Sequence, residues 1–215
     1  MRKILFTREI SSFPLHEFPN SEFRFQPLIH KVSLPLSSSD RKEIENTKNW
    51  IISSGNTYKI LGNKNIRSSS SVNLWAVGEV DQSIQWGGVR KFDYSKDLVE
   101  ALEESKEESF AFLGAKQPLP SFQENLKSTK KGVKFFALYE TKPLSIQFVQ
   151  NFHAIVFFSP SAVKSYLSQN QAKSEKIYCI GKTTGRFCQK FWKDVSWPEK
   201  PNRKALIELL KQDLS

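Results

Sequence analysis

Residues 50–58 read WIISSGNTY, and residues 155–163 read IVFFSPSAV. Both segments open with a continuous run of apolar side chains, which is typical of a strand that is buried on both faces of a parallel sheet. A serine turn then ends each apolar run, and serine is a preferred residue at the start of a helix. The chain therefore contains two copies of one strand–turn–helix unit.

The similarity continues beyond the two serine turns. Residues 74–78 read LWAVG, and residues 177–181 read IYCIG, so each copy leads into a second buried strand that ends in glycine. Segments with helical spacing, such as residues 97–102, separate the apolar runs. Strands that alternate with helices predict an α/β fold with right-handed crossovers. The repeat predicts two similar, flavodoxin-like lobes of parallel sheet. Further apolar runs lie at residues 4–6, 110–113 and 135–138.

Two proline-containing stretches indicate where the chain passes between the lobes. Residues 25–36 contain Pro27 and Pro35, and residues 140–145 contain Pro143. Proline lacks a backbone donor and disfavours helix in the preceding residue, so both stretches are expected to be extended. A chain that crosses twice leaves one lobe continuous and assembles the other from both ends of the sequence. The predicted boundaries are residues 1–28 with 146–215 for the discontinuous lobe, 37–139 for the continuous lobe, and 29–36 with 140–145 for the connecting hinge strands.

Composition and charge exclude several classes of protein. The 215 residues are 39% hydrophobic and 25% charged, which is ordinary for a globular protein. No apolar run approaches the roughly 20 residues of a membrane span. The first residues lack the long apolar segment of a signal peptide, so we expect a cytoplasmic protein without membrane contact. The net charge is +10, but the basic residues are scattered, which argues against a nucleic-acid-binding face and suits a cleft for a small polyanion.

Familiar catalytic and metal-binding motifs are missing from the sequence. Two cysteines, Cys179 and Cys188, cannot supply a four-ligand zinc site, and the three histidines have no metal-ligand spacing. The tripeptide GKT at residues 181–183 suggests a phosphate loop, but that motif requires a glycine where Lys176 stands. No serine elbow follows any strand. The sequence therefore does not indicate chemistry by a conventional nucleophile.

Small and hydroxylic residues follow the predicted strands, at the edge where the carboxyl ends of parallel strands meet. Ligands of open parallel sheets bind beyond this edge, where helix N-termini offer unpaired N–H groups and partial positive charge. Any one of these turns could serve only as a helix cap, but six of them on two lobes predict an anion-binding cleft. The turns are Thr7-Arg8, Ser54-Gly55-Asn56, Gly78-Glu79, Gly114-Ala115-Lys116, Ser159-Pro160-Ser161 and Gly181-Lys182-Thr183-Thr184.

Three motifs in the second half of the chain carry a resemblance to a known family. Residues 139–143 read YETKP, at the end of a predicted strand that leads into the hinge. Residues 157–163 read FFSPSAV, and residues 180–184 read IGKTT, ahead of a final predicted helix at about residues 202–214. Together and in this order, the motifs resemble the uroporphyrinogen-III synthase family, and the similarity extends over most of the chain.

The resemblance implies an activity that needs no conventional nucleophile. It implies cyclisation of the linear tetrapyrrole hydroxymethylbilane to uroporphyrinogen III, with loss of water and inversion of the last pyrrole ring. The substrate supplies its own electrophile and nucleophile, so the protein must fold it and direct the attack. Hydroxymethylbilane is the implied small-molecule partner, and no metal or organic cofactor is implied. A monomer is expected, with transient contact to hydroxymethylbilane synthase left open.

The resemblance also implies roles for individual residues. Tyr139 is the expected acid that assists departure of the substrate hydroxyl, because a phenol is protonated at neutral pH. A buried structural tyrosine is the alternative. The residues expected to bind substrate are Ser159, Ser161, Lys176, Gly181, Thr183 and Thr184 in one lobe, with Ser54, Asn56 and Gly78 in the other.

Two other functions are compatible with the same sequence. The first is non-catalytic binding of a small anion, such as a sugar phosphate or a nucleotide, by the two lobes. The second is binding of nucleic acid, which predicts an affinity that falls steeply with salt. Incubation with hydroxymethylbilane distinguishes the enzyme from both, because only the enzyme converts it to the type III isomer.

Overall fold

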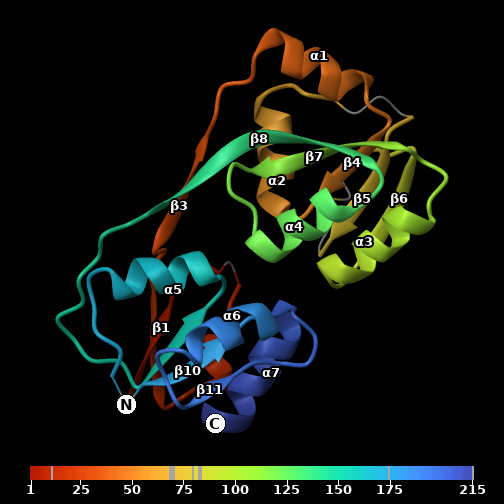
Figure 1. The fold of residues 1–215 in the computed structure, drawn as a ribbon. Helices are drawn as coiled ribbons and strands as arrows, with labels where there is room; N and C mark the ends of the chain where they lie inside the picture. Colours follow the sequence, from red (N-terminus) through yellow and green to blue (C-terminus); the bar gives the residue numbers. More distant parts are fainter. Residues whose placement is uncertain (11, 68–70, 79, 82–83, 174, 215) are drawn as a thin grey trace. The chain divides into compact units, whose positions relative to one another are not determined.

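The computed structural model describes residues 1–10, 12–67, 71–78, 80–81, 84–173 and 175–214. Contacts divide the chain into two compact units. We call them the first unit (Met1–His30 with Lys142–Ser215) and the second unit (Lys31–Thr141). Each unit contains its own β-sheet (Figure 1). The chain passes from one unit to the other inside the two segments that were predicted as connections.

The first unit contains a five-stranded parallel sheet with the order β11-β10-β9-β1-β2. Read from the β2 edge and numbered along the unit, this order is 2-1-3-4-5, the flavodoxin-like arrangement. The strands are β1 (Arg2–Phe6), β2 (Ser21–Phe25), β9 (Ala154–Phe157), β10 (Lys176–Cys179) and β11 (Val195–Ser196). The helices are η1 (Leu15–Glu17), α5 (Pro160–Leu167), α6 (Lys182–Cys188) and α7 (Arg203–Leu214).

The second sheet has six strands in the order β3-β8-β7-β4-β5-β6. The five strands from β4 to β8 pair in parallel, and β3 lies at the edge beside β8. The strands are β3 (Ile29–Ser33), β4 (Asn49–Ile52), β5 (Asn73–Val77), β6 (Gly88–Phe92), β7 (Ser109–Ala115) and β8 (Gly132–Pro143). The helices are α1 (Ser38–Asn46), α2 (Gly55–Asn63), α3 (Ser95–Glu104) and α4 (Pro120–Ser128). The predicted α/β class with two mostly parallel sheets is confirmed.

The two strands of the sequence repeat lie at the centres of their sheets and are buried on both faces. All residues of β4 and of β9 are buried. In β4, Ile52 and Ile51 belong to different core clusters, because successive side chains of a strand point to opposite faces. In β9, Ile155 and Val156 are divided in the same way. Since burial of one such side chain contributes roughly 1.5–3 kcal/mol, these strands anchor the turns that follow them.

The connecting segments pair with each other at both ends. The Leu34 N–H donates to the Leu138 carbonyl at 2.9 Å, and the Leu144 N–H donates to the Leu28 carbonyl at 2.8 Å. The buried hydroxyl of Ser165 in α5 lies 2.6 Å from the Leu28 carbonyl and 3.0 Å from the Leu144 carbonyl. One side chain of the first unit therefore holds both connecting segments where they leave that unit.

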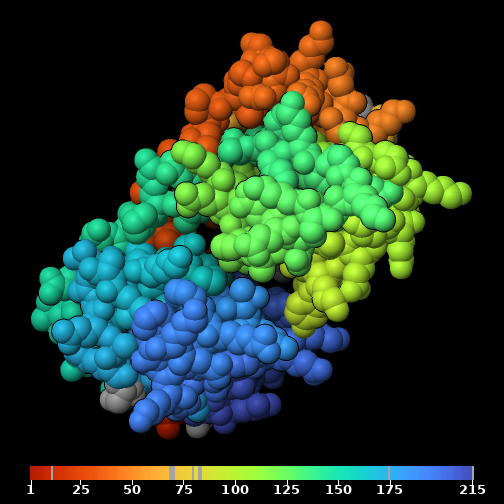
Figure 2. All heavy atoms as spheres, viewed as in Figure 1, coloured from red at the N-terminus to blue at the C-terminus, as the bar shows by residue number. Residues whose placement is uncertain are grey.

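Helix α1 shows how local sequence sets a helix of the second unit. The Ser37 hydroxyl accepts a hydrogen bond from the Asp40 N–H at 3.0 Å and so caps the helix. Ile44 is the one buried residue of α1, and the rest of this orange segment lies at the surface in Figure 2.

Within the described part of the chain, no helix is both long and apolar enough to cross a membrane.

Candidate functional site

Ser54 stands where the order of strands reverses in the second sheet. It follows β4, whose neighbours β5 and β7 continue the chain in opposite directions across the sheet. Ligands of doubly wound sheets bind at this switch point. The Ser54 hydroxyl accepts a hydrogen bond from the Asn56 N–H at 3.4 Å, so it caps α2. Helix capping was the alternative role that the sequence allowed for each of these turns. The cap uses only part of its hydrogen-bonding capacity, because a hydroxyl has two acceptor positions and one donor.

Tyr139 lies in β8 with its phenol against the Ser54 turn. Its side chain is 4% exposed, and the hydroxyls of Ser54 and Thr57 lie beside the phenol. Burial raises the pKa of Tyr139 above its usual value of 10.0, and these two neighbouring hydroxyls oppose this shift. The phenol is therefore protonated at neutral pH, as an acid requires. It also belongs to the core of the unit, so the structural interpretation of Tyr139 describes its packing correctly.

A β-bulge brings Tyr139 to this position. The pairing of β7 with β8 shifts register between Gly114 and Ala115, so that Ala115 lies opposite Tyr139. Successive strand residues normally face opposite sides, yet Leu138 and Tyr139 enter the same core cluster because the bulge inserts an extra residue. The Lys116 N–H fixes the bulge by donating to the Tyr139 carbonyl at 2.8 Å.

Lys31 also contacts this cluster, and the sequence analysis did not single it out. Its ammonium lies 5.0 Å from the centroid of the Tyr139 ring and donates a hydrogen bond to the Ser54 hydroxyl at 3.2 Å. Lys31 comes from β3, so only the pairing of distant strands brings it here, and no local motif signals it. Thr57 was missed too, although its spacing of one helical turn from Ser54 was a usable signal.

The other predicted residues of the second unit lie at the same edge of the sheet. Asn56 is partly buried in the first turn of α2. Gly78 follows β5, the neighbour of β4, and its φ of 87° lies in the left-handed region that favours glycine. Glu79, the other residue of that predicted turn, lies outside the described residues.

In the first unit, the structure brings two predicted turns to one edge of the sheet. Ser159 and Gly181 follow β9 and β10, which are paired neighbours. The Ser159 hydroxyl caps α5 by accepting from the Ala162 N–H at 3.3 Å, and Ser161 is exposed in the first turn.

The turn at Gly181 differs from the serine turn beside it. No side chain of the described residues caps α6, which begins directly after Gly181. A Cβ at Gly181 would lie 2.7 Å from Pro201, so the close approach of that proline requires glycine. Thr183 is exposed, whereas Thr184 is 4% exposed. Thr183 is therefore the threonine whose side chain can reach a ligand.

Lys176 is not brought together with these turns. It begins β10, whereas Gly181 follows the opposite end of the same strand. Its ammonium lies 2.9 Å from the Asp213 carboxylate, and this contact holds the pKa of Asp213 below its usual value. The Tyr178 hydroxyl donates to the same carboxylate at 3.1 Å. Lys176 therefore fastens α7 to the sheet. Although Lys176 and Gly181 are close in sequence, they lie at opposite ends of an extended strand, which lengthens by about 3.3 Å per residue.

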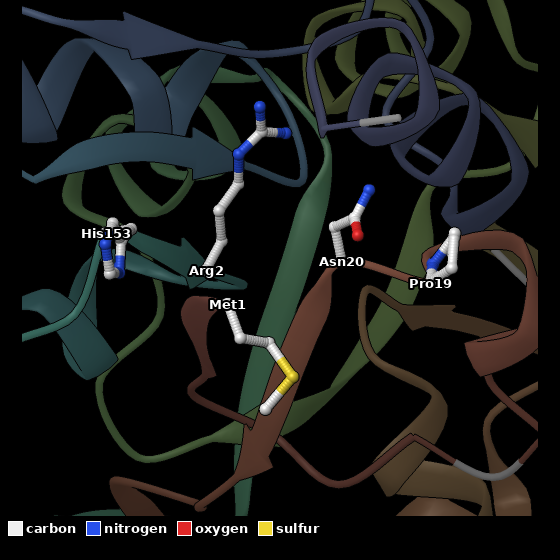
Figure 3. A pocket seen from close by; sticks show the side chains of 5 residues that line it. All are labelled: Met1, Arg2, Pro19, Asn20 and His153. Carbon is white, nitrogen blue, oxygen red and sulfur yellow. The ribbon is translucent and has the colours of Figure 1, made fainter.

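A cavity of about 490 Å³ lies at the amino-terminal edge of the first sheet (Figure 3). It is lined by Met1, Arg2, Pro19, Asn20 and His153. Arg2 already donates to the Leu214 carbonyl at 2.8 Å, and His153 accepts from the Lys3 N–H at 3.0 Å. The predicted turns follow the opposite ends of the strands, so the cavity is separate from them. Among the described residues, no three His, Cys, Asp or Glu side chains are grouped as a metal site.

Comparisons with known proteins agree with this architecture. The family model described as uroporphyrinogen-III synthase HemD matches residues 25–208. A uroporphyrinogen-III synthetase structure from Helicobacter pylori is similar with a TM-score of 0.68 and 18% identity, over 99% of both chains. A mutant uroporphyrinogen III synthase from Thermus thermophilus is similar with a TM-score of 0.63 and 12% identity, over 99% of this chain and 98% of that one. No curated protein matches the sequence.

The two structural similarities establish the fold, and the family match identifies the chain. The matched segment includes the Ser54 turn, Tyr139 and both turns of the first unit. The motifs that carry the sequence resemblance all lie within this segment, so the resemblance and the family match agree. This protein belongs to the uroporphyrinogen-III synthase family, cyclising lyases of porphyrin and haem biosynthesis.

Proposed function

We propose that the protein converts hydroxymethylbilane to uroporphyrinogen III with Tyr139 as the acid. The observation that carries the assignment is a buried, protonated phenol beside the hydroxyls of Ser54 and Thr57. It lies in the unit whose switch point is occupied by Ser54, where ligands of such sheets bind. A phenol held in this way can give up its proton when the Ser54 hydroxyl stabilises the phenolate, whereas the Thr57 hydroxyl donates to the Leu113 carbonyl at 3.5 Å.

The first step breaks the bond between carbon and oxygen in the hydroxymethyl group. Tyr139 transfers its phenolic proton to the hydroxyl oxygen, which keeps the electron pair of the broken bond and leaves as water. The substrate becomes an azafulvene cation, and Tyr139 becomes a phenolate. The substituted carbon of the last pyrrole ring then attacks the cation and forms a spiro intermediate. Rearrangement and loss of one substrate proton give the product, and that proton replaces the one that the protein supplied in the first step.

The hydroxylic turns supply the means to hold an acidic substrate. Each pyrrole carries an acetate and a propionate, and carboxylates accept hydrogen bonds from hydroxyls and backbone N–H groups. We assign carboxylate binding in the first unit to Ser159, Ser161, Gly181 and Thr183, with the exposed hydroxyls of Ser161 and Thr183 as the main donors and buried Thr184 contributing only its backbone N–H. Asn56 and Gly78 are assigned the same role in the second unit, beside Ser54. The net charge of +10 favours approach of such a polyanion.

Turnover distinguishes this proposal from simple binding of a small anion. Purified protein is mixed with a large molar excess of hydroxymethylbilane, and loss of the substrate is followed against a protein-free sample. An enzyme consumes many equivalents faster than the spontaneous reaction. A protein that only binds the substrate protects at most one equivalent, and that result would reject the proposal.

We also propose that the enzyme works as a monomer in the cytoplasm. Each sheet is complete within one chain. The connecting strands at residues 29–36 and 140–145 serve as the hinge between the lobe of residues 37–139 and the lobe of residues 1–28 with 146–215. Transient delivery of substrate by hydroxymethylbilane synthase is compatible with a monomer. Light scattering on the protein as it elutes from a size-exclusion column should give the mass of one chain, 24.8 kDa. A measured mass of twice that value would reject the monomer.

A further inference from the structure

The hydrogen bonds around Ser54 fix the direction in which its hydroxyl points. Its oxygen accepts from the Lys31 ammonium at 3.2 Å and from the Asn56 N–H at 3.4 Å. A hydroxyl has two acceptor positions and one proton. Because both acceptor positions are occupied, the group that Ser54 can still offer to the neighbouring Tyr139 phenol is its proton. The three groups therefore stand in the order that a chain of donors from Lys31 through Ser54 to Tyr139 requires.

We propose that Lys31 is a positioning residue that acts on Tyr139 through Ser54, as the charged end of a short proton relay. The inference rests on the proposed function, because it concerns the acid step assigned to Tyr139. It adds a residue from β3, outside the predicted turns, and it gives the hydroxyl of Ser54 a task beyond capping α2.

The relay keeps protons and charge in balance during the acid step. When Tyr139 gives its proton to the departing hydroxyl, the neighbouring Ser54 hydroxyl has a proton to offer the new phenolate oxygen. The Ser54 proton moves to that oxygen while Lys31 passes one ammonium proton to Ser54. Lys31 is then a neutral amine, and both Ser54 and Tyr139 carry a proton again. The proton that the substrate releases in its last step returns to Lys31 along the same chain.

The position of the ammonium supports the same role by electrostatics. A cation 5.0 Å from the ring centroid favours negative charge on the phenol, and this attraction acts at the moment when charge develops. Lys31 itself is exposed, so its ammonium is in exchange with water. Lys134, on β8, lies at a similar 5.5 Å from the Phe136 ring but pairs with Glu43, and Phe136 has no group to protonate. Lys134 therefore offers a matched comparison within the same unit.

A competing role for Lys31 is direct binding of a substrate carboxylate. The two roles differ in the kinetic constant that they affect. Loss of a carboxylate contact weakens binding and raises KM, whereas loss of an interaction made during the acid step lowers kcat. The competing role also requires no coupling between Lys31 and Ser54.

The experiment compares five variants: Lys31→Met, Lys31→Arg, Ser54→Ala, the double variant Lys31→Met/Ser54→Ala, and the control Lys134→Met. Steady-state kcat and KM for formation of uroporphyrinogen III are measured for each, and thermal unfolding checks that each variant folds. We expect Lys31→Met to lower kcat by about 10-fold to 100-fold, the range for a lost charged hydrogen-bond partner, with little change in KM. Lys31→Arg, which keeps the charge and the donor, should recover most of kcat.

The double variant tests whether Lys31 acts through Ser54. In a relay, it should lose no more activity than the more damaged single variant, because either change breaks the same chain. Independent, multiplying losses would overturn the relay, and so would a rise in KM alone or kinetics equal to those of Lys134→Met. If the wild-type protein forms no uroporphyrinogen III, the proposed function fails and the relay fails with it. If the wild-type protein is active, each of these failures applies to the relay alone.

Discussion

Tyr139 has two roles in this account: its ring is part of a hydrophobic core, and its phenol is the assigned acid. The combination depends on the bulge between Gly114 and Ala115, which places Tyr139 on the same face as Leu138. The sequence analysis proposed Tyr139 as the acid through the resemblance carried by the YETKP motif. It could not find the bulge, because one extra residue in a strand leaves the pattern of apolar residues almost unchanged. It could not find Lys31 either, because Lys31 lies on β3 and is brought to Ser54 and Tyr139 only by the pairing of distant strands.

Tyr139→Phe should lower kcat by roughly 10²–10⁴-fold, the usual contribution of a general acid. The variant should remain folded, because the ring that fills the core is kept. The measurement is steady-state conversion of hydroxymethylbilane, together with thermal unfolding.

Tyr58→Phe is the matched control for this prediction. Tyr58 is buried in the same core cluster, and burial together with Asp81 raises its pKa to about 12. Its hydroxyl is buried without a hydrogen-bond partner among the described atoms, so its removal should leave kcat unchanged. If the two variants lose activity equally, Tyr139 has no chemical role.

The thiols of Cys179 and Cys188 should be unreactive in the native protein. Both are buried, their sulfurs lie 3.5 Å apart, and the contact with Cys188 together with burial raises the pKa of Cys179. The thiolate is the reactive species, so alkylation at neutral pH should be slow until the protein unfolds. Mass spectrometry after iodoacetamide treatment, with and without denaturant, measures this; rapid modification of the native protein would contradict the burial of this pair.

At the scale of elements, the sequence predicted what is buried and missed what lies at edges. Every apolar run that we identified became a strand, and the final helix was predicted close to its observed bounds, Arg203–Leu214. The missed strands were β2, β6 and β11. In β6 the three central residues are exposed, so no apolar run marks the strand, and its pairing with β5 is what makes it one. Edge strands depend on a partner's backbone, which local sequence does not reveal.

Gly185→Ala should destabilise the protein by about 1–3 kcal/mol, the usual cost of overpacking. Gly185 lies in α6, and an added Cβ would come within 2.1 Å of the Trp197 ring. Gly62→Ala in α2 is the control, because nothing lies within 4 Å of its added Cβ. That change should stabilise the protein by about 0.4–1 kcal/mol. Denaturant unfolding measures both, and equal effects would contradict the packing of α6 against Trp197.

The ion pair between Lys176 and Asp213 should make α7 sensitive to acid. The pKa of Asp213 is lowered from 3.8 in the folded protein, so its contribution to stability is present above that value and is lost as pH falls through the folded pKa. At pH 7, Asp213→Asn should cost about 0.2–1 kcal/mol, the range for partly exposed pairs. The cost should shrink as the pH is lowered below 3.8.

Denaturant unfolding at neutral and acidic pH tests this dependence. Glu100→Gln is the control, because its partner Lys96 is 79% exposed and the pair should contribute less. A cost for Asp213→Asn that is the same at both pH values would contradict the role of its charge.

At the scale of the whole molecule, the two sheets share one spatial order with different connectivity. When the repeated strands are matched, β4 with β9 and β5 with β10, the order β6-β5-β4-β7-β8 corresponds to β11-β10-β9-β1-β2. In the first unit, the two strands at the end of this order, β1 and β2, come from the beginning of the chain. In the second unit, the corresponding strands, β7 and β8, come from the end of that unit's own segment. The internal repeat and the prolines of the connections were therefore sufficient to predict two similar units. The assembly of one unit from both ends of the chain was part of that prediction, but the pairing of β2 with β1 was not predictable, because β2 is an edge strand without an apolar run.

The identity of the product isomer tests the central claim most directly. Hydroxymethylbilane closes spontaneously to the type I isomer, whereas an enzyme that inverts the last ring produces the type III isomer. The products are oxidised to porphyrins and the isomers are separated by chromatography, with a protein-free sample as reference. We predict that type III predominates when catalytic amounts of the protein are present. A product that remains type I, in the proportion found without protein, would contradict the account.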